Sequence, residues 1–256
     1  MEVNNDLFDL TGKNAIVTGG SRGLGEFYTL ALMMHGANVL VVTSSERGWS
    51  KISEKCNKYK GEIHFLKQDL IESNASENIV SKAIEKLGSI DILVNNAGIQ
   101  IRNDIFNYKK DDWNSVININ LNATYFLSHE VSKYMAKQNS GKIINIGSMQ
   151  SYRAGKNIFP YTTSKHGVIG ITKAYADALA PYNIQVNALS PGYIKTDMTK
   201  SLEEDPIRGP EIKEHIPSGN WGYPSNLMGP LIFLASSASD YITGVSIPVD
   251  GGYLLR

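Results

Sequence analysis

The chain has 256 residues, and its 25 basic and 25 acidic side chains give a formal net charge of zero at pH 7. This length suits one domain with a large core, and the balanced charge argues against a nucleic-acid or membrane-surface partner. No apolar stretch approaches the roughly 20 residues that span a bilayer, which argues against a membrane-embedded protein.

The cysteine, the histidines and the first residues of the chain indicate the cellular compartment and whether a metal site is expected. The single cysteine, Cys56, cannot form an internal disulfide, which fits a reducing compartment. The polar opening Met1–Asp6 has neither the basic nor the apolar region of a secretory signal. The five histidines show no metal-ligand spacing. We therefore expect a cytoplasmic protein without a metal site.

Short β-branched segments alternate with longer helical segments along the chain. We expect strands at 14–17, 38–42, 63–67, 90–94, 141–146, 185–189 and 246–249, and helices near 24–35, 47–58, 75–87, 112–138, 160–180 and 224–235. Near-continuous apolar strands such as 90–94 are typical of a sheet covered on both faces. The pattern predicts an α/β fold of Rossmann type: a doubly wound, seven-stranded parallel sheet with helices on both faces, in one domain over residues 1–256.

The first predicted strand leads into a glycine-rich turn. Gly19, Gly23 and Gly25 stand between that strand and a helical segment. A strand, glycine turn and helix in succession present backbone N–H groups and a positive helix end to a pyrophosphate. The spacing differs from the usual G-x-G-x-x-G fingerprint. Taken alone, these glycines also fit a turn that serves only helix packing.

A second group of residues carries acid–base chemistry. Tyr161 and Lys165 stand four residues apart, and Ser148 lies thirteen residues before Tyr161 at the end of a strand-like segment. On a helix such a pair shares one face about 5–6 Å apart. A cation about 4 Å from a phenol, at an effective dielectric near 20, favours the phenolate by about 4 kcal/mol, or about 3 pKa units. The group therefore predicts a proton donor with a lowered pKa and a hydroxyl that holds a carbonyl, although the spacing alone also occurs on solvated helices.

Seven short segments occur together in one order: Thr18–Gly25, Asp69–Leu70, Asn95–Gly98, Asn118–Asn120, Ile146–Ser148, Tyr161–Lys165 and Ser190–Gly192. In this order and spacing the chain resembles the short-chain dehydrogenase/reductase family over essentially its whole length. Asn95–Gln100 and several segments between residues 216 and 253 are similar to the sugar-acid branch of that family, which includes 2-dehydro-3-deoxy-D-gluconate 5-dehydrogenase and gluconate 5-dehydrogenase.

The resemblance implies an NAD(P)-dependent enzyme that interconverts a secondary alcohol and a ketone on a sugar acid. Tyr161 would exchange the proton, Lys165 would lower its pKa and bond the nicotinamide ribose, and Ser148 would orient the carbonyl. Asn120 is a poor helix former inside a long predicted helix, and it would hold a water behind Lys165. Two alternatives stay open: a reductase of another ketone class, such as 3-oxoacyl or cyclic ketones, and a non-catalytic dinucleotide-binding protein.

For the dinucleotide, the resemblance implies contacts at both ends. The adenosine and pyrophosphate end would use Gly19, Ser21, Arg22, Gly23, Leu24, Gly25, Ser44, Asp69, Leu70, Asn95, Ala97 and Gly98; the nicotinamide end would use Tyr161, Lys165, Pro191, Gly192, Ile194 and Thr196. The choice between NAD and NADP stays open. The residues after the second strand include no Asp that would favour NAD, and Ser44, Arg47 and Arg22 suit a phosphate whereas Glu46 opposes one.

Substrate residues are expected near the same crevice. A sugar acid requires a cation for its carboxylate, and arginine offers a two-pronged match. Arg102, Arg153 and Lys156 are candidates for that cation, with Gln100, Asn157 and Trp221 as further pocket residues, and a solvated surface position is the alternative for each cation. The polar segment from Thr196 to Trp221 is expected to form a lid. The resemblance also implies a homotetramer that binds no nucleic acid and no membrane.

Overall fold

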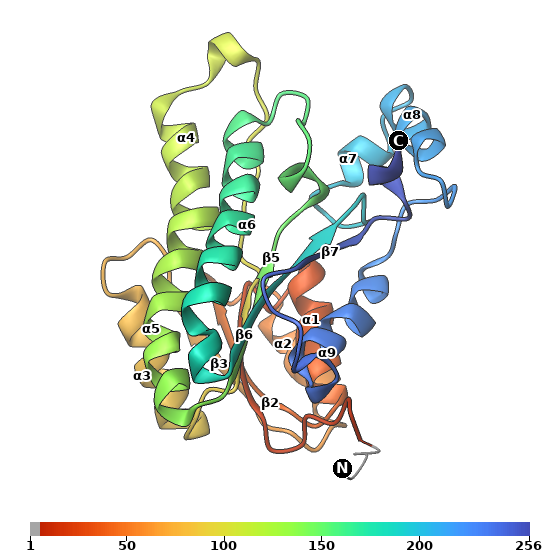
Figure 1. Cartoon of the computed structure of the whole chain (residues 1–256). Helices are drawn as coiled ribbons and strands as arrows, with labels where there is room; N and C mark the ends of the chain where they lie inside the picture. Colours follow the sequence, from red (N-terminus) through yellow and green to blue (C-terminus); the bar gives the residue numbers. More distant parts are fainter. Residues whose placement is uncertain (1–5) are drawn as a thin grey trace.

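The structure, a computed structural model, describes residues 6–256; most of the polar opening that we interpret as lacking a secretory signal lies outside these residues. All seven strands form one parallel sheet in the order β3-β2-β1-β4-β5-β6-β7 (Figure 1). The strands are β1 (Asn14–Thr18), β2 (Asn38–Thr43), β3 (Ile63–Lys67), β4 (Ile92–Asn95), β5 (Gly141–Ile146), β6 (Ile184–Pro191) and β7 (Ser246–Val249). The predicted seven-stranded Rossmann-type sheet is therefore confirmed.

The strand order reverses between β1 and β4. The chain leaves β1 toward β2 and β3 on one side, and after β4 it continues toward β5, β6 and β7 on the other. In open α/β sheets, ligands bind in the crevice outside the carboxyl ends of the strands at such a point. The glycine turn after β1 and the Asn95–Gly98 segment after β4 both lie at this position.

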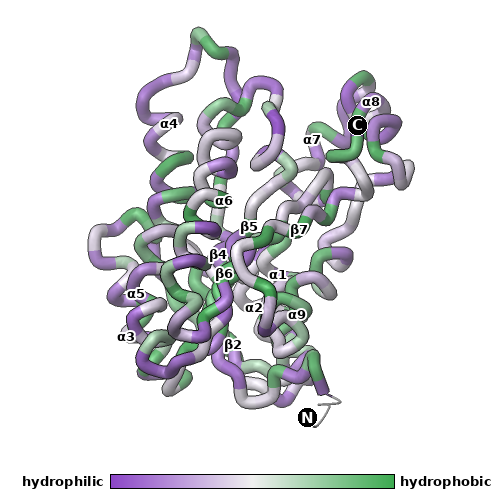
Figure 2. The backbone as a smooth tube through the Cα atoms, viewed as in Figure 1, coloured by the Kyte–Doolittle hydropathy of each residue, from purple (hydrophilic) through white to green (hydrophobic). Residues whose placement is uncertain are grey.

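Helices cover both faces of the sheet (Figure 1). One face carries α1 (Gly23–Met34), α2 (Trp49–Cys56) and α9 (Met228–Ala235), and the other carries α3 (Ala75–Leu87), α5 (Ala123–Gln138) and α6 (Phe159–Leu179). Successive strand side chains point to opposite faces. Ala15 and Val17 of β1 accordingly join the core beneath α1 and α9, whereas Ile16 joins the core beneath α3 and α5. Figure 2 shows hydrophilic residues on the outward turns of α3, α4 and α5.

The helix expected over residues 112–138 is interrupted. It begins as α4 (Lys110–Ile117), widens to a π-helical turn at Asn118–Asn122, and continues as α5. Single π-turns inside helices are frequent at functional sites. Asn120 lies in this turn with only 1% of its surface exposed, so the departure from α-geometry coincides with a buried polar side chain.

The polar 196–221 segment contains two short helices, α7 (Lys200–Glu203) and α8 (Arg208–His215). Ile212 of α8 and Ile216, which directly follows the helix, pack with Met149, Trp221 and Tyr253 in a small core separate from the two beneath the sheet helices. This core places α8 beside the residue that follows Ser148 in sequence. No helix within residues 6–256 combines the length and the apolar character needed to cross a membrane.

Candidate active site

The glycine turn is built for close approach of backbone to backbone. Gly19 and Gly23 have φ of 65° and 57°, a region that favours glycine. A Cβ added to Gly25 would lie 2.0 Å from the carbonyl oxygen of Gly19, so only glycine fits there. Helix α1 has no side-chain cap, which leaves backbone N–H groups of its first turn for another acceptor. The turn therefore fits a dinucleotide pyrophosphate.

Asn96 holds this turn against β4. Its amide nitrogen donates to the carbonyl oxygens of Thr18 and Gly19 at 2.9 and 3.2 Å. The Thr18 hydroxyl accepts from the backbone N–H groups of Asn96 and Ala97, both at 3.0 Å. Sequence reasoning singled out Asn95, Ala97 and Gly98 and missed Asn96, although a short amide beside a glycine turn was the available signal.

Asn95 points into the sheet layer instead. Only 5% of its surface is exposed, and its amide nitrogen donates to Asn145 Oδ1 and Ser128 Oγ, both at 2.9 Å. These bonds tie β4 to β5 and α5 at the carboxyl end of the sheet. Asn95 thus braces the crevice from behind, and its predicted contact with the cofactor stays a prediction.

Asn120 connects the segment after β4 to α6. Its Oδ1 accepts from the Ile99 N–H at 2.8 Å, and its Nδ2 donates to the Ile99 carbonyl at 3.0 Å and to Ser164 Oγ at 3.1 Å. The Ser164 hydroxyl donates to the Tyr161 carbonyl at 2.7 Å. A Cβ on Gly98 would lie 3.3 Å from Asn120 Oδ1 and 3.8 Å from Lys165 Nζ, so these groups share one small volume.

Ser148 and Tyr161 come together across the gap between β5 and α6. The Ser148 side chain lies close enough to the phenol of Tyr161 to act on its pKa, in the direction that lowers it. Ser151 fixes this geometry, because its hydroxyl donates to the Lys165 carbonyl at 2.8 Å and accepts from the Ser148 N–H at 3.2 Å. Sequence reasoning missed Ser151 and Ser164, whose polar side chains near the motif residues gave only a weak signal.

Lys165 is buried, with 5% of its surface exposed, and its ammonium donates to the Ile146 carbonyl at 2.6 Å. The ammonium nitrogen lies 5.7 Å from the centroid of the Tyr161 ring. Burial lowers the pKa of Lys165 to about 8. Burial also raises the pKa of Tyr161, against the opposing effect of the Ser148 hydrogen bond. The expectation that Lys165 lowers the pKa of Tyr161 stays a prediction, because burial and Ser148 are the influences on Tyr161 that the structure shows.

The remaining predicted cofactor residues line the same edge of the sheet. Ser21 is buried, and its hydroxyl donates to the Arg47 carbonyl at 2.8 Å, which holds the loop after β2 against the glycine turn. Gly192 packs against Asp250, since a Cβ there would lie 2.6 Å from that residue. The other predicted residues lie at the start of α1 or at the carboxyl ends of strands and just beyond them: Arg22, Leu24, Ser44, Asp69, Leu70, Pro191, Ile194 and Thr196.

The predicted substrate residues divide into two groups. Arg102 donates to the Lys156 carbonyl, and the Asn157 carbonyl accepts from the Asn103 N–H at 3.1 Å, so these two loops are joined beside the crevice. Arg153, in contrast, lies over the Tyr253 ring with 4.8 Å to its centroid. It also lines a cavity of about 470 Å³ with Tyr152, Pro248, Leu254 and Arg256.

Trp221 and Gln150 are both buried. Trp221 is buried with its ring centroid 4.9 Å from that of Tyr193, and Gln100 is half-buried two residues after Gly98. Gln150, two residues after Ser148, is 6% exposed, and its Oε1 has no hydrogen-bond partner among the described residues. Sequence reasoning did not consider Gln150, and a polar residue directly after Ser148 and Met149 was the only available signal.

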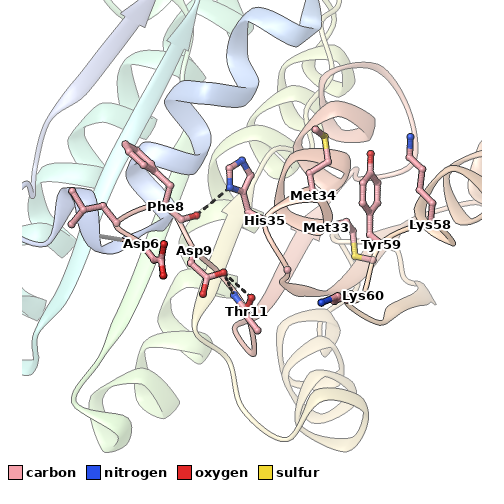
Figure 3. A pocket seen from close by; sticks show the side chains of 12 residues that line it. Asp6, Phe8, Asp9, Thr11, Met33, Met34, His35, Lys58, Tyr59 and Lys60 are labelled. Carbon is pink, nitrogen blue, oxygen red and sulfur yellow. Dashed lines mark hydrogen bonds between the residues drawn. The ribbon is translucent and has the colours of Figure 1, made fainter. Parts of the chain in front are cut away.

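A cavity of about 670 Å³ lies at the other end of the molecule (Figure 3). Phe8, Met33, Met34 and His35 line it together with Lys58, Tyr59 and Lys60 from the connection between α2 and β3. These connections precede the amino ends of the parallel strands. The cavity is therefore separated by the length of the sheet from the crevice that contains Tyr161.

Comparison with known proteins places these features in a family. A family model described as short chain dehydrogenase matches residues 13–207. The 2-dehydro-3-deoxy-D-gluconate 5-dehydrogenase of Escherichia coli (strain K12) is 42% identical over 250 residues, which cover 97% of this chain and 98% of that protein. A 3-oxoacyl-[acyl-carrier-protein] reductase of Thermotoga maritima is 35% identical over 246 residues, covering 96% of this chain and 99% of that protein.

A solved structure agrees with these relatives over the whole fold. The gluconate 5-dehydrogenase from Burkholderia cenocepacia J2315, in complex with NADP and tartrate, superposes with a TM-score of 0.92 and 33% sequence identity. The match covers 98% of this chain and 98% of that one. The family resemblance inferred from the seven sequence segments is confirmed.

Proposed function

Because this chain belongs to the short-chain dehydrogenase family, we propose that it is an NAD(P)-dependent oxidoreductase that interconverts a secondary alcohol and a ketone on a sugar acid of the gluconate or 2-keto-3-deoxygluconate type. The NAD(P) dependence and the redox chemistry follow from the family. The sugar acid is supported by the 42% identical relative and by the NADP- and tartrate-bound neighbour. The observation that carries the proposal is the grouping of Ser148, Tyr161 and Lys165: Ser148 acts on the phenol of Tyr161, and the Lys165 ammonium lies 5.7 Å from the centroid of the Tyr161 ring.

The reaction divides into hydride and proton transfer. NAD(P), when bound, supplies the hydride in reduction and accepts it in oxidation. Tyr161 donates its phenolic proton to the carbonyl oxygen in reduction and removes the hydroxyl proton in oxidation. The Ser148 hydroxyl holds the same oxygen and favours its developing negative charge.

Lys165 and Asn120 support the proton transfer. Lys165 would bond the nicotinamide ribose of a bound NAD(P), and its ammonium adds a positive charge near Tyr161 as the phenol ionises. Asn120 holds the segment after β4 against α6 through its bonds to Ile99 and Ser164, and the water that it would hold behind Lys165 stays a prediction. Pro191, Gly192, Ile194 and Thr196 would hold the carboxamide end of the nicotinamide, and Asp69 and Leu70 would hold the adenine. The 196–221 segment acts as the lid over the substrate.

The direct test is turnover. Purified protein with NADPH and 5-keto-D-gluconate, or with NADP and gluconate or 2-keto-3-deoxygluconate, is expected to change absorbance at the nicotinamide band. A 3-oxoacyl thioester and a neutral cyclic ketone serve as comparison substrates, since a reductase of those classes is the alternative that the Thermotoga relative suggests. The sugar-acid proposal would be rejected if the protein turned over a comparison substrate but turned over no sugar acid at any pH from 6 to 10.

We further propose that the enzyme prefers NADP to NAD. Arg22 and Arg47 are both exposed, and the bond from the Ser21 hydroxyl to the Arg47 carbonyl joins the loops that carry them. No ion pair within the described residues uses either arginine. Two free guanidinium groups beside the adenosine ribose suit a 2′-phosphate. The proposal is supported by the NADP in the structural neighbour.

Substitutions around this proposed phosphate site are expected to change the binding of NADPH and of NADH differently. Arg47→Met is expected to weaken NADPH binding about three- to tenfold, as typical of an exposed charge pair, and to leave NADH binding unchanged. Glu46→Gln is expected to tighten NADPH binding because it removes a like charge. Fluorescence titration with both nucleotides measures this, with Lys137→Met on the remote helix α5 as the control. Equal effects of Arg47→Met on NADPH and NADH would show that the arginine does not contact a 2′-phosphate.

We also propose a homotetramer, as the family resemblance implies, located in the cytoplasm. Large aromatic side chains lie exposed on α4 and α5: Trp113 and Tyr125 are 43% exposed and Phe126 is 55% exposed. Such apolar patches mark interaction surfaces. The cytoplasm is supported by the unpaired Cys56, whose burial raises its pKa to about 11 and keeps the thiol protonated.

Phe126→Lys is expected to reduce the assembly to dimers or monomers, because it places a charge at the centre of the proposed helix interface. Light scattering behind size-exclusion chromatography measures this against the 28.2 kDa mass of one chain. Met34→Lys, at the end of α1 and outside the α4–α6 face, is the control with a comparable exposed apolar residue. A wild-type protein that elutes as a monomer would contradict the proposal.

A further inference from the structure

Gln150 is a buried polar side chain whose hydrogen bonding is incomplete. Only 6% of its surface is exposed, and its Oε1 has no hydrogen-bond partner among the described residues. Buried side-chain oxygens in folded proteins almost always accept a hydrogen bond, so an exception needs an explanation. The surroundings of Gln150 provide one.

The backbone of Gln150 contacts the hydroxyl of Ser148 directly. Gln150 lies in the short 3₁₀ turn Met149–Ser151 that follows β5, and its N–H donates to Ser148 Oγ at 3.1 Å. A serine hydroxyl has one hydrogen to donate and two lone pairs that accept. Because the Gln150 N–H uses a lone pair, it leaves the hydrogen of Ser148 to the carbonyl oxygen of the substrate. Gln150 is therefore the direct neighbour of the group that we propose holds the reacting carbonyl.

The side-chain amide of Gln150 lies against the loop that joins this turn to helix α6. A Cβ added to Gly155 would lie 3.0 Å from Gln150 Oε1 and 2.3 Å from Ile158 Cδ1. Gly155 thus leaves room for the amide, and Ile158, which directly precedes α6, packs on the same glycine. Tyr161 lies three residues further along, in the first turn of that helix. The amide therefore lies beside the segment that connects Ser148 to Tyr161.

This loop is held in place by the segment that follows β4. The hydroxyl of Tyr108 lies 2.9 Å from the Asn157 carbonyl oxygen, and the Asn103 N–H donates to the same oxygen at 3.1 Å. The Tyr108 ring packs edge-on against Phe159, the first residue of α6, with ring centroids 5.7 Å apart. Because the loop is fixed at its end, it keeps its position beside Gln150. A donor for Gln150 Oε1 therefore has to come from a bound molecule.

An amide oxygen selects its ligand by hydrogen-bond type. It accepts a hydrogen from a hydroxyl group, whereas an ionised carboxylate only accepts and an apolar group offers nothing. A site built to bond a substrate hydroxyl discriminates strongly against the analogue that lacks it, because the polar group of the site is then left unpaired. The missing donor beside Ser148 thus fits a hydroxyl close to the reacting carbonyl.

We propose that the Gln150 amide binds a hydroxyl on the carbon next to the reacting carbonyl, so that the enzyme selects α-hydroxy ketones and the corresponding vicinal diols. This inference rests on the proposed oxidoreductase function and names the substrate feature that the site requires. The backbone of Gln150 orients Ser148 toward the carbonyl oxygen, and the side chain of the same residue holds the neighbouring hydroxyl. A keto-sugar acid has such a hydroxyl, whereas a 3-oxoacyl thioester and an unsubstituted cyclic ketone do not.

Substrate pairs that differ by one hydroxyl test the amide. 5-Keto-D-gluconate is compared with its 4-deoxy and 6-deoxy analogues, and 3-hydroxy-2-butanone is compared with 2-butanone. Gln150→Met keeps the length of the side chain and removes its polar atoms, and Gln150→Leu is made in case Gln150→Met does not fold. Gln185→Met is the matched control, since Gln185 is also buried, with 9% of its surface exposed, and lies near the amino end of β6.

Gln150→Met is expected to lower kcat/KM for the hydroxy ketone of each pair about ten- to hundredfold. The value for the butanone and for one of the two deoxy analogues should stay within about threefold, so that the preference of the wild type for the hydroxyl is lost. The coupling between side chain and hydroxyl follows from the four values of each pair. Equal losses for both members of a pair would overturn the inference, because the amide would then support the loop or an ordered water.

Thermal melting tests the missing partner independently of turnover. Because Gln150 Oε1 has no bond to lose within the described residues, Gln150→Met should melt within about 1 °C of the wild type or higher. Gln185→Met should melt about 1–3 °C lower, because it removes the bond that Gln185 Nε2 donates to Asn183 Oδ1. A melting temperature of Gln150→Met several degrees below that of the wild type would reject the inference, since the amide would then stabilise the fold without a ligand.

The same assays separate this inference from the proposed sugar-acid function. A wild type that turns over no sugar acid but prefers 3-hydroxy-2-butanone to 2-butanone rejects the sugar acid, and it supports the inference if Gln150→Met loses that preference and Gln185→Met keeps it. A wild type that turns over 5-keto-D-gluconate and both deoxy analogues equally well supports the sugar acid and rejects the inference. A wild type that reduces no ketone of either pair rejects both.

Discussion

Tyr161→Phe is expected to lower kcat for ketone reduction about a hundred- to ten-thousandfold, which is the contribution of a positioned general acid. Phenylalanine keeps the ring that packs beside Lys165 and removes only the hydroxyl that hydrogen-bonds with Ser148. NADPH affinity is therefore expected to remain within about threefold of the wild-type value, since one hydrogen bond contributes little to binding compared with the contacts to the pyrophosphate. Stopped-flow reduction assays and fluorescence titration of NADPH measure the two quantities.

Tyr182→Phe is the matched control, because it removes a phenolic hydroxyl from a residue that is 48% exposed in the short turn after α6. It should leave both quantities unchanged. Ser148→Ala adds a pH readout: it removes the hydrogen bond that lowers the pKa of Tyr161, so the pH dependence of alcohol oxidation should move to higher pH. Equal loss of turnover and of NADPH binding in Tyr161→Phe would reject the assigned role of this residue.

Lys165→Met is expected to abolish most turnover and at the same time to stabilise the protein at pH 7. Burial lowers the pKa of Lys165 from its ordinary 10.5 to about 8. The folded state therefore pays for a buried cation, a cost of about 3 kcal/mol by conversion of the shift. The substitution removes this cost, but it also removes the hydrogen bond to the Ile146 carbonyl, which contributes about 1 kcal/mol to stability. A net gain of about 2 kcal/mol corresponds to a melting temperature higher by about 4–8 °C.

The sign of the pH dependence follows from the direction of this shift. Below pH 8 the lysine is charged in both the folded and the unfolded state, and the full cost of burial is present. Between pH 8 and 10.5 the folded state releases its proton first, so the cost is relieved as pH rises. The stability difference between Lys165→Met and wild type should therefore be largest near pH 7 and shrink toward pH 10.5.

Urea unfolding at pH 7 and at pH 10.5 measures this difference. Lys173→Met is the control, since Lys173 lies exposed on the same helix α6 and should change stability little at either pH. A variant that is less stable than wild type at pH 7 would contradict the burial cost. A difference that stays constant to pH 10.5 would show that the effect comes from packing and not from titration.

The pKa of Tyr161 shows what helical spacing alone leaves undetermined. Spacing along a helix predicts that Lys165 and Tyr161 share a face, and the ammonium does lie 5.7 Å from the ring. The effect of that ammonium depends on how much water surrounds both groups, and sequence spacing contains no information on water. In the folded protein the Tyr161 pKa is raised by burial, and Lys165 donates to Ile146 instead.

Local patterns alone determined the architecture and the chemical residues. Alternating apolar strands and helices predicted the seven-stranded sheet, because side-chain periodicity reflects which faces of an element are buried. The glycines of the first turn could be recognised because positive φ and close backbone contact exclude other residues, as at Gly25. Ser148, Tyr161 and Lys165 could be singled out because acid–base chemistry needs those side chains in that spacing.

Tertiary structure alone decided which distant side chains meet. Asn96 bonds Thr18 across 78 positions, Asn120 bonds Ser164 across 44, and Ile212 of α8 joins the small core that contains Met149. Such pairs depend on the order of strands in the sheet and on how α8 packs against Met149, not on any local period. The sequence therefore determined what chemistry the protein carries, and the packing of remote segments decided how that chemistry is braced, shielded from water and supplied with charge.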